Sequence, residues 1–363
     1  MNITRTGSIA AIALIGAIAL SSCAANEAPS DTKTVSKLSG TIDGAGASSQ
    51  GSAEDAWVAA FQGDNPKVTI NYDPSGSGAG RAAFAAGGVN FAGSDSALKP
   101  EEIAAGFQGC VAGSGYVQVP AYISPIALIF NVEGVKDLNL DAATVAGIFK
   151  GTITKWDDKA IADLNPDAKL PSADITAVHR SDDSGTTKNF ADYLNKVAPT
   201  VWDAAPADTF PYSAGEAAQG TSGVVDAVTN GTNTIGYADA SKAGKLSVAK
   251  IEVGTKFVSP SAEGAAAVVA ESPANDTAND TDLSVKLNRV TTDPSHYPLV
   301  LVSYIITCVE FQDAKVAPAV KAYIQYITSE AGQKVAAESA GAAPLSSELS
   351  SKVATALDAI VTK

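Results

Sequence analysis

The sequence predicts an α/β fold of two lobes connected by two long strands. Short apolar runs of strand type alternate with segments of helical spacing along most of the chain, a pattern typical of α/β sheets. Two apolar runs, at 115–132 and 297–311, are much longer than the others and lie far apart in the sequence. We therefore expect the chain to leave the first lobe, build the second and return, crossing between the lobes twice.

The first lobe is expected to begin with helices and strands in alternation. Ala53, Trp57 and Phe61 recur four residues apart, which predicts the buried face of a helix within 52–62. VTINY (68–72) alternates as a half-buried strand does, and VNFAG (89–93) predicts a second, shorter strand.

The second lobe is expected to continue this alternation. Its helices are predicted at 141–149 and in the segments KAIADL, FADYL and VVDAV, and its strands at 175–178, 234–238 and 247–252. The segment 270–284 is polar and partly repetitive, which predicts a solvated loop. From Ala314 the chain is helical again, with a break at GAAP and a last amphipathic helix that ends near Val361.

The amino terminus predicts export. A single basic residue, Arg5, precedes an apolar run at 9–20 that is too short to span a bilayer comfortably, which is typical of a secretory signal peptide at 1–22. The following Leu-Ser-Ser-Cys resembles a lipoprotein cleavage site. It predicts that Cys23 is lipidated and that 23–40 tethers the protein to the outer face of the cell membrane. The alternative is an ordinary signal peptide followed by a chance cysteine.

The mature chain is strongly acidic. The sequence has 25 basic and 39 acidic residues, and removal of 1–22 takes away Arg5 and no acid. The net charge is then 24 − 39 = −15, which disfavours nucleic acid and anionic membrane as partners. Roughly 320 residues remain, enough for two lobes with cores of their own.

Few cysteines and histidines are present. With Cys23 lipidated, Cys110 and Cys308 remain, and two remaining cysteines in an exported protein usually pair. Cys110 shortly precedes the first long strand and Cys308 lies late in the second, so antiparallel strands would bring them to the same side. Two separate buried thiols are the alternative. His179 and His296 form no cluster with the cysteines, and neither a metal site nor a cofactor is expected.

Glycines and small polar residues gather in four segments at strand ends. They are TIDGAGASSQGS (41–52), DPSGSGAGR (73–81), AGSDSAL (92–98) and VHRSDDSGTT (178–187). A helix start offers unpaired N–H groups and the positive end of a dipole, so turns of this kind can bind an anion. The plainer interpretation of 178–187 is a helix N-cap, Asp183 or Ser184, beside a surface ion pair. The segments complete neither a dinucleotide fingerprint nor a P-loop.

These motifs, in this order, resemble the phosphate-binding proteins of bacterial phosphate ABC transporters, the Pst-type solute-binding family. The resemblance is carried by GAGAS, SGSGAG, FAGSD, HRSDDSGTT, IGYAD and the long segment IFKGTITKWDDKAIADLNPDAKLP. It runs from about Ile42 to the carboxyl terminus and is weakest at 200–220 and 255–295.

The resemblance implies a two-lobed, periplasmic-binding-protein-like fold of type II. Lobe I would comprise 41–126 and 297–363, and lobe II 127–296. The implied function is high-affinity binding of inorganic phosphate outside the cytoplasm and its delivery to the membrane permease of an ABC transporter. We expect such a protein to be a monomer and not an enzyme.

The resemblance also implies the groups that hold one dehydrated phosphate between the lobes. The implied binding residues are Ser48, Ser49, Ser77, Asp95, Arg180, Ser184, Gly185 and Thr186. Arg180 would clamp the phosphate oxygens, and Asp182 would pair with Arg180 and fix its orientation. Ser49 would contribute its backbone N–H. Asp95 would accept a proton that phosphate carries near neutral pH and sulfate lacks.

Two positions depart from the family pattern. Ser49 stands where the family commonly has an aromatic residue, and Asp183 stands where it often has glycine. A contact through the backbone makes the first departure tolerable, whereas the second adds negative charge near the site.

Two other functions remain open on the sequence. A secreted phosphatase or hydrolase would need a base beside a serine or ligands for two metals. Only His179 lies near a serine-rich segment, and strand alternation points it away from Arg180. A binding protein for another tetrahedral oxyanion, such as sulfate or molybdate, is the second alternative.

Overall fold

The computed structural model describes residues 37–362, which lie in one compact unit. The predicted signal peptide, Cys23 and most of the predicted tether lie outside the described residues. Nine strands of the described part form one mixed sheet in the order β2-β1-β3-β12-β4-β8-β6-β7, with β9 attached to β4. A second sheet has the order β11-β10-β5.

Lobe I begins with three parallel strands that the sequence predicted. They are β1 (Gly40–Gly46), β2 (Val68–Asp73) and β3 (Phe91–Ser94), with helices α1 (Gly51–Asp64), α2 (Ser77–Ala85) and α3 (Pro100–Ala105) between or after them. In β2 the apolar Val68 and Ile70 are buried and their neighbours Thr69 and Asn71 are exposed, as the alternation requires. Trp57 lies in the buried face of α1.

The two long strands pair antiparallel, which confirms the expected double crossing. Strand β4 (Tyr116–Asn131) lies along β12 (Val300–Cys308), with Cys308 opposite Tyr116 and Val300 opposite Pro125. From Ile126 onward β4 pairs instead with β8 (Thr234–Asp239). One strand therefore belongs to both lobes, and the sheet passes without a break from one lobe to the other.

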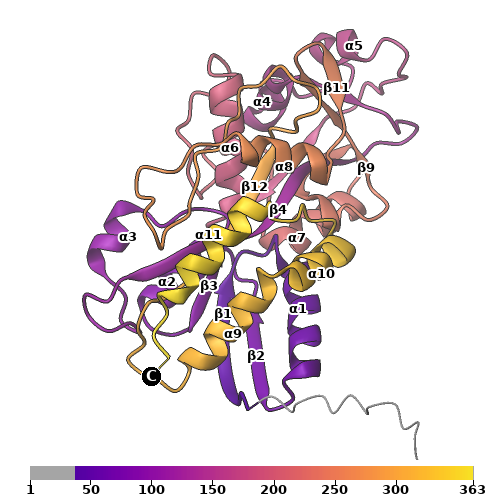
Figure 1. Ribbon diagram of the computed structural model, residues 1–363. Helices are drawn as coiled ribbons and strands as arrows, with labels where there is room; N and C mark the ends of the chain where they lie inside the picture. The colour runs from indigo at the N-terminus through magenta and orange to yellow at the C-terminus, as the bar shows by residue number, and fades with distance from the viewer. Residues whose placement is uncertain (1–36, 363) are drawn as a thin grey trace, which may run out of the picture. The chain divides into compact units, whose positions relative to one another are not determined.

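Lobe II carries the helices and strands of the middle of the chain. They are α4 (Ala142–Lys150), α5 (Lys159–Leu164), β6 (Thr176–Arg180), α6 (Gly185–Val197), β7 (Glu216–Ala218) and α7 (Gly220–Asn230). Strand β6 lies between β8 and β7 and is parallel to both. In Figure 1 α4, α5 and α6 lie at the opposite end of the molecule from β2 and α9.

The carboxyl-terminal helices return to lobe I. Helices α9 (Ala317–Ile327), α10 (Glu330–Ala340) and α11 (Ser347–Asp358) pack near α1 and β4 (Figure 1). The indole Nε1 of Trp57 donates a hydrogen bond of 2.7 Å to the carbonyl of Gly332 in α10. The last helix ends close to the predicted position.

One prediction about the second half of the chain is wrong in part, and one helix there was not predicted. The segment 247–252 is two strands: β9 (Ser247–Val248) pairs with β4, and β10 (Lys250–Val253) pairs with β11 (Lys256–Val258) and β5 (Asn139–Leu140). Helix α8 (Ala262–Ala270) was not predicted.

The loop at 270–284 is exposed in its middle but not at its end. Asp282 is fully buried and accepts hydrogen bonds from the hydroxyl of Tyr116 (2.8 Å) and the amide of Gln118 (2.7 Å), both in β4. A buried carboxylate needs such partners, and they come from a strand that is distant in sequence. The local polarity of the segment therefore could not reveal the burial.

The hydrophobic core is continuous between the lobes. One large cluster of buried residues contains Trp57 in lobe I, Leu128 in β4 and Phe190 in lobe II, and a second, smaller cluster that includes Val178 and Val224 lies within lobe II. The large cluster spans both lobes because β4, which pairs with β12 in lobe I and with β8 in lobe II, is buried along nearly its whole length. The predicted disulfide is confirmed: it joins Cys110 and Cys308, which are 198 residues apart in the sequence.

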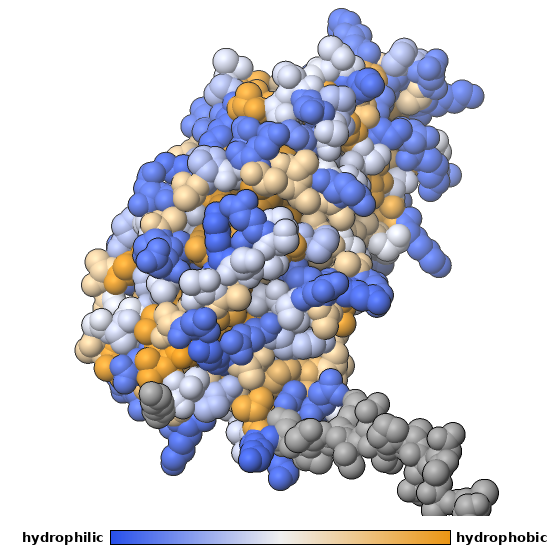
Figure 2. Space-filling model, in the orientation of Figure 1, coloured by the Kyte–Doolittle hydropathy of each residue, from blue (hydrophilic) through white to orange (hydrophobic). Residues whose placement is uncertain are grey.

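The surface carries only scattered apolar groups. Figure 2 shows a face that is mostly hydrophilic, with hydrophobic residues in separate patches. The large hydrophobic side chains that are exposed among the described residues belong to Val197, Val290 and Val361. Within 37–362, every helix is too short or too polar to cross a bilayer.

Candidate anion-binding site

Asp95 lies at the centre of the predicted site. It follows β3 directly and is 5% exposed. Its Oδ1 accepts a hydrogen bond of 2.7 Å from the hydroxyl of Ser49, which follows β1 in lobe I. Its Oδ2 accepts one of 2.9 Å from the hydroxyl of Thr186, in the first turn of α6 in lobe II. The carboxylate is therefore held by donors from both lobes.

Burial determines the acidity of Asp95. Loss of water raises the pKa of this carboxyl above its ordinary value, and the hydrogen bonds from Ser49 and Thr186 and the charge of Arg180 only partly oppose it. The carboxyl of Asp95 therefore holds a proton more readily than an exposed aspartate does.

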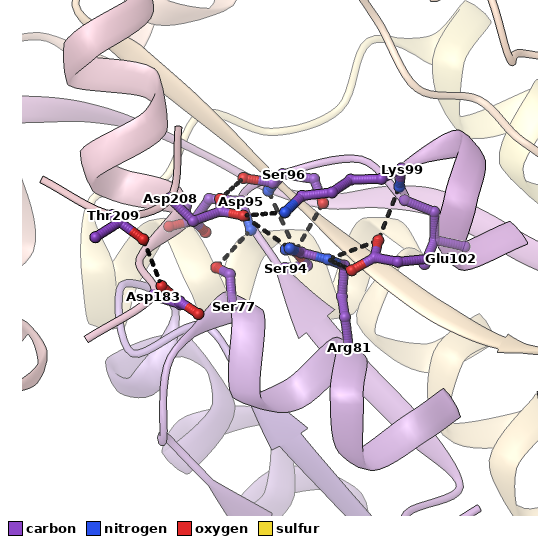
Figure 3. Close-up of polar contacts among 12 residues, drawn as sticks. Ser77, Arg81, Ser94, Asp95, Ser96, Lys99, Glu102, Asp183, Asp208 and Thr209 are labelled. Atoms are coloured by element: carbon purple, nitrogen blue, oxygen red, sulfur yellow. Dashed lines mark hydrogen bonds and ion pairs between the residues drawn. The ribbon is translucent and has the colours of Figure 1, made fainter. Parts of the chain in front are cut away.

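Ser77 and Gly185 bring the starts of two helices against Asp95. The backbone N–H of Asp95 donates to the hydroxyl of Ser77 (3.1 Å), the first residue of α2 (Figure 3). Gly185 begins α6, and a Cβ added there would lie 2.6 Å from the Cβ of Asp95 and 2.6 Å from the hydroxyl of Ser77. Only glycine lets the amino terminus of α6 approach lobe I this closely.

Arg180 is buried and its orientation is fixed. It is the last residue of β6 and is 3% exposed. Its Nε donates to Oδ1 of Asp182 (2.7 Å), and its Nη2 donates to Oδ2 of the same carboxylate. The predicted pair of Arg180 and Asp182 is therefore present. The N–H of Gly220 donates to Oδ1 of Asp182 as well (2.9 Å).

The charge of Arg180 also sets the acidity of its partner. Burial by itself would raise the pKa of Asp182, but the hydrogen bond and the positive charge of Arg180 outweigh it and the pKa is lowered. A guanidinium has five N–H groups, and Asp182 accepts from two nitrogens of Arg180. The same cation can thus bind a second anion while it stays in place.

The helix N-cap interpretation of 178–187 is correct, but the surface ion pair is not. The side chain of Ser184 accepts a hydrogen bond of 3.2 Å from the N–H of Thr187, so Ser184 is the N-cap of α6. The side chains of Arg180 and Asp182 are only 2% and 12% exposed. A buried cation beside a helix amino terminus is a setting that favours an anion.

Ser48 bonds across to Thr221 in lobe II. Its hydroxyl oxygen lies 3.0 Å from that of Thr221 and accepts a hydrogen bond of 3.1 Å from the N–H of Thr221. Thr221 was not predicted, although it belongs to a fifth strand-to-helix turn of small residues, GTSG at 220–223. The motif GTSG could therefore have indicated Thr221, but it adjoins residues 200–220, where the resemblance to the family is weakest.

The two departures from the family pattern have different surroundings. Ser49 contacts Asp95 through its hydroxyl as well as offering a backbone N–H, which the sequence did not predict. Asp183 is exposed, and its Oδ1 accepts a hydrogen bond from the hydroxyl of Thr209 (2.8 Å). Its carbonyl accepts from the N–H of Gly78 in lobe I (3.0 Å).

Other buried polar groups around the site gave no signal in the sequence. The amide of Asn189 donates to the carbonyls of Asp95 (2.8 Å) and Gly185 (2.9 Å). Asp208, in the loop after α6, accepts hydrogen bonds from Arg81 and Ser96 of lobe I. These partners come together only in the folded chain.

His179 is packed against an aromatic ring. Its imidazole stacks on Phe210 with 3.9 Å between the ring centres, and its Nδ1 lies 2.9 Å from the carbonyl of Arg180. Among residues 37–362, no three His, Cys, Asp or Glu side chains are grouped so that they could hold a metal ion.

The fold and the site define a two-lobed solute-binding protein, and comparison with known proteins agrees. The family model of the PBP superfamily domain matches residues 31–331. Phosphate-binding protein PstS 3 of Mycobacterium leprae is 36% identical over 324 residues, which cover 88% of this chain and 87% of that protein. PstS 3 of Mycobacterium tuberculosis is 34% identical over 377 residues, which cover 99% of this chain and 100% of that protein. The chain belongs to the Pst-type phosphate-binding protein family.

Solved structures share the fold. A phosphate-binding protein from Stenotrophomonas maltophilia is 23% identical, with a TM-score of 0.67, over 87% of this chain and 93% of its own. A high-affinity periplasmic phosphate-binding protein, PfluDING, solved with phosphate at pH 8.5, is 22% identical, with a TM-score of 0.69. The match covers 86% of this chain and 93% of that protein.

Proposed function

We propose that this protein binds inorganic phosphate outside the cytoplasm and delivers it to the permease of an ABC transporter for import. The observation that carries the proposal is a buried carboxylate, Asp95, held by donors from both lobes close to the buried cation Arg180. A carboxylate is out of place in a site for a fully ionised anion. It fits a ligand that brings its own proton, as phosphate does.

The remaining groups of the site suit an oxyanion that has lost its water. Ser48, Ser49, Ser77, Ser184, Gly185 and Thr186 offer hydroxyls and backbone N–H groups at strand ends and helix starts, and they are neutral. Hydrogen bonds to a charged ligand contribute about 1.5–3 kcal/mol each. Several such bonds and one guanidinium can therefore hold an anion inside a protein of large negative charge.

The decisive experiment is calorimetry with phosphate, arsenate and sulfate at neutral pH. We expect phosphate and arsenate to compete for one site and sulfate to bind weakly or not at all. Tighter binding of sulfate or molybdate than of phosphate would favour the alternative oxyanions. Release of phosphate from a chromogenic phosphoester would instead indicate a phosphatase.

A pair of variants tests whether the named residues form the site. Arg180→Ala is expected to abolish measurable phosphate binding, since it removes the buried cation. Ser77→Ala is expected to weaken binding by about 1–3 kcal/mol. Lys155→Ala, which removes an exposed ion pair with Asp174, is the control and should bind as the parent does. Parental affinity in both site variants would place the site elsewhere.

The cellular setting is part of the same proposal. We infer that residues 1–22 are a signal peptide, that Cys23 is lipidated and that the protein works as a monomer tethered to the outer face of the membrane by 23–40. Mass spectrometry of the mature protein from the membrane fraction tests the lipid, and Cys23→Ser should release the protein into the medium.

A further inference from the structure

A buried cluster of charges connects the lobes beside the proposed phosphate site. Asp208 lies in lobe II, between α6 and β7, and its side chain is 4% exposed. Its Oδ2 accepts a hydrogen bond of 2.8 Å from Nη2 of Arg81, and its Oδ1 accepts one of 2.6 Å from the hydroxyl of Ser96. The ammonium of Lys99 lies 3.5 Å from Oδ2. All three partners belong to lobe I (Figure 3).

The lobe I side of this cluster is held in place without Asp208. The Nε of Arg81 lies 3.0 Å and 3.1 Å from the two carboxylate oxygens of Glu102, and its Nη1 donates to the hydroxyl of Ser94 (2.9 Å). That hydroxyl in turn donates to the carbonyl of Ser96 (2.6 Å). Arg81 is therefore aimed at Asp208 by its own lobe.

Asp208 is also bonded to the start of α6, the helix that begins in the proposed phosphate site. The backbone carbonyl of Asp208 accepts a hydrogen bond of 2.9 Å from the N–H of Ser184, the N-cap of α6. Ser96 follows Asp95 in sequence, and Arg81 lies one turn after Ser77 in α2. The side chain of Asp208 thus grips lobe I while its backbone fixes the start of α6.

We infer that Asp208 is a positioning residue whose carboxylate latches lobe II to lobe I around the bound ligand. The inference rests on the proposed function, and Asp208 itself does not touch the phosphate. If the lobes separate, Asp208 returns to water while Arg81 keeps Glu102. The contacts of Asp208 with lobe I therefore stabilise the closed form alone, and their loss should speed the release of ligand more than it slows its capture.

The test uses Asp208→Asn in the full chain, with Asp203→Asn as a matched control. Asp203 lies in the same loop and pairs with Lys150 of its own lobe at 2.8 Å. The control substitution therefore removes one carboxylate without changing a contact with lobe I. We expect phosphate dissociation, measured by stopped flow, to be about ten- to a hundredfold faster in Asp208→Asn. Association should change less than twofold, and the control should match the parent. An unchanged dissociation rate would overturn the inference.

Two further measurements keep the result unambiguous. Should Asp208→Asn fail to fold, Ser96→Ala removes only the hydroxyl donor and is expected to speed dissociation severalfold; a parental rate would again contradict the latch. Should the parent not bind phosphate at all, the proposed function fails. The latch is then judged by small-angle scattering without ligand, where Asp208→Asn must have a larger radius of gyration than both the parent and Asp203→Asn.

Discussion

At the scale of single residues, we propose that Asp95 decides selectivity. An ionised carboxylate facing a ligand O–H makes a strong hydrogen bond, whereas facing sulfate it meets lone pairs and negative charge. The contacts of Asp95 with Ser49 and Thr186 fix its oxygens, so the carboxylate cannot turn away from an unsuitable ligand. The acid therefore selects rather than attracts.

Asp95→Asn should relax this selectivity. The amide can turn its NH₂ toward the ligand, so we expect the variant to keep phosphate binding, weakened by about 1–3 kcal/mol, and to gain detectable sulfate binding. A competition titration with sulfate at neutral pH measures the change. A parent that already binds sulfate as well as phosphate would show that Asp95 does not face the ligand.

The raised pKa of Asp95 predicts how sulfate binding by the parent depends on pH. Above that pKa the carboxylate is ionised and repels sulfate. As the pH falls toward it, Asp95 takes up a proton and can donate it, so sulfate affinity should rise, by at most about tenfold per pH unit. Calorimetry over a series of pH values measures this slope. Asp95→Asn should abolish it, and a slope that persists in the variant would assign it to another group.

At the scale of elements, a buried glutamate joins α1 to α9 by a hydrogen bond. Glu54 of α1 accepts a hydrogen bond of 2.6 Å from the hydroxyl of Tyr323 in α9 and one of 3.2 Å from the amide of Gln50. Burial is the main cause that raises the pKa of Glu54 from 4.5 to about 7, against the lowering effect of the bond from Tyr323. The folded chain therefore keeps a proton here that the unfolded chain loses at lower pH.

Glu54→Gln should make the fold less sensitive to pH. Below pH 4.5 Glu54 is protonated in both the folded and the unfolded parent, so its ionisation takes nothing from the free energy of unfolding. Between pH 4.5 and about 7 only the unfolded state ionises, so stability is lost, by an amount on the order of 3 kcal/mol. Urea unfolding should show the variant gaining on the parent across this window. Glu101→Gln, at an exposed position, controls for the lost charge, and an equal gain there would refute the assignment.

Elements whose signal is local were predictable, and elements that depend on distant partners were not. The alternation in β2 and the four-residue spacing in α1 report burial directly. The split between β9 and β10 is invisible in the sequence because both halves are apolar and only their pairing differs. Similarly, motifs at strand ends led to the prediction of Asp95 and Arg180 as site residues, whereas Asp208 lies in an irregular loop and is joined to Arg81 only in the folded chain.

At the scale of the whole molecule, the disulfide closes the two long strands and all of lobe II between them into one loop. It joins Cys110, just before β4, to Cys308 at the end of β12, across 198 residues. In the chain-entropy model such a loop stabilises the folded state by about 5 kcal/mol. The variant with both cysteines changed to alanine should lose a large part of this in urea unfolding while its phosphate affinity stays within a few fold. Unchanged stability would show that the bond does not constrain the unfolded chain.

The place of β12 in the middle of the sheet sets the order in which the protein can be completed. It lies between β3 and β4, yet it is the last strand to be made, whereas β4, β6, β7 and β8 of lobe II all precede residue 240. A chain emerging from its amino terminus can therefore assemble the sheet of lobe II while β3 and β4 still await the strand that separates them. The lobe that begins first is the one that finishes last, and until then its open strand edges stay exposed to other chains.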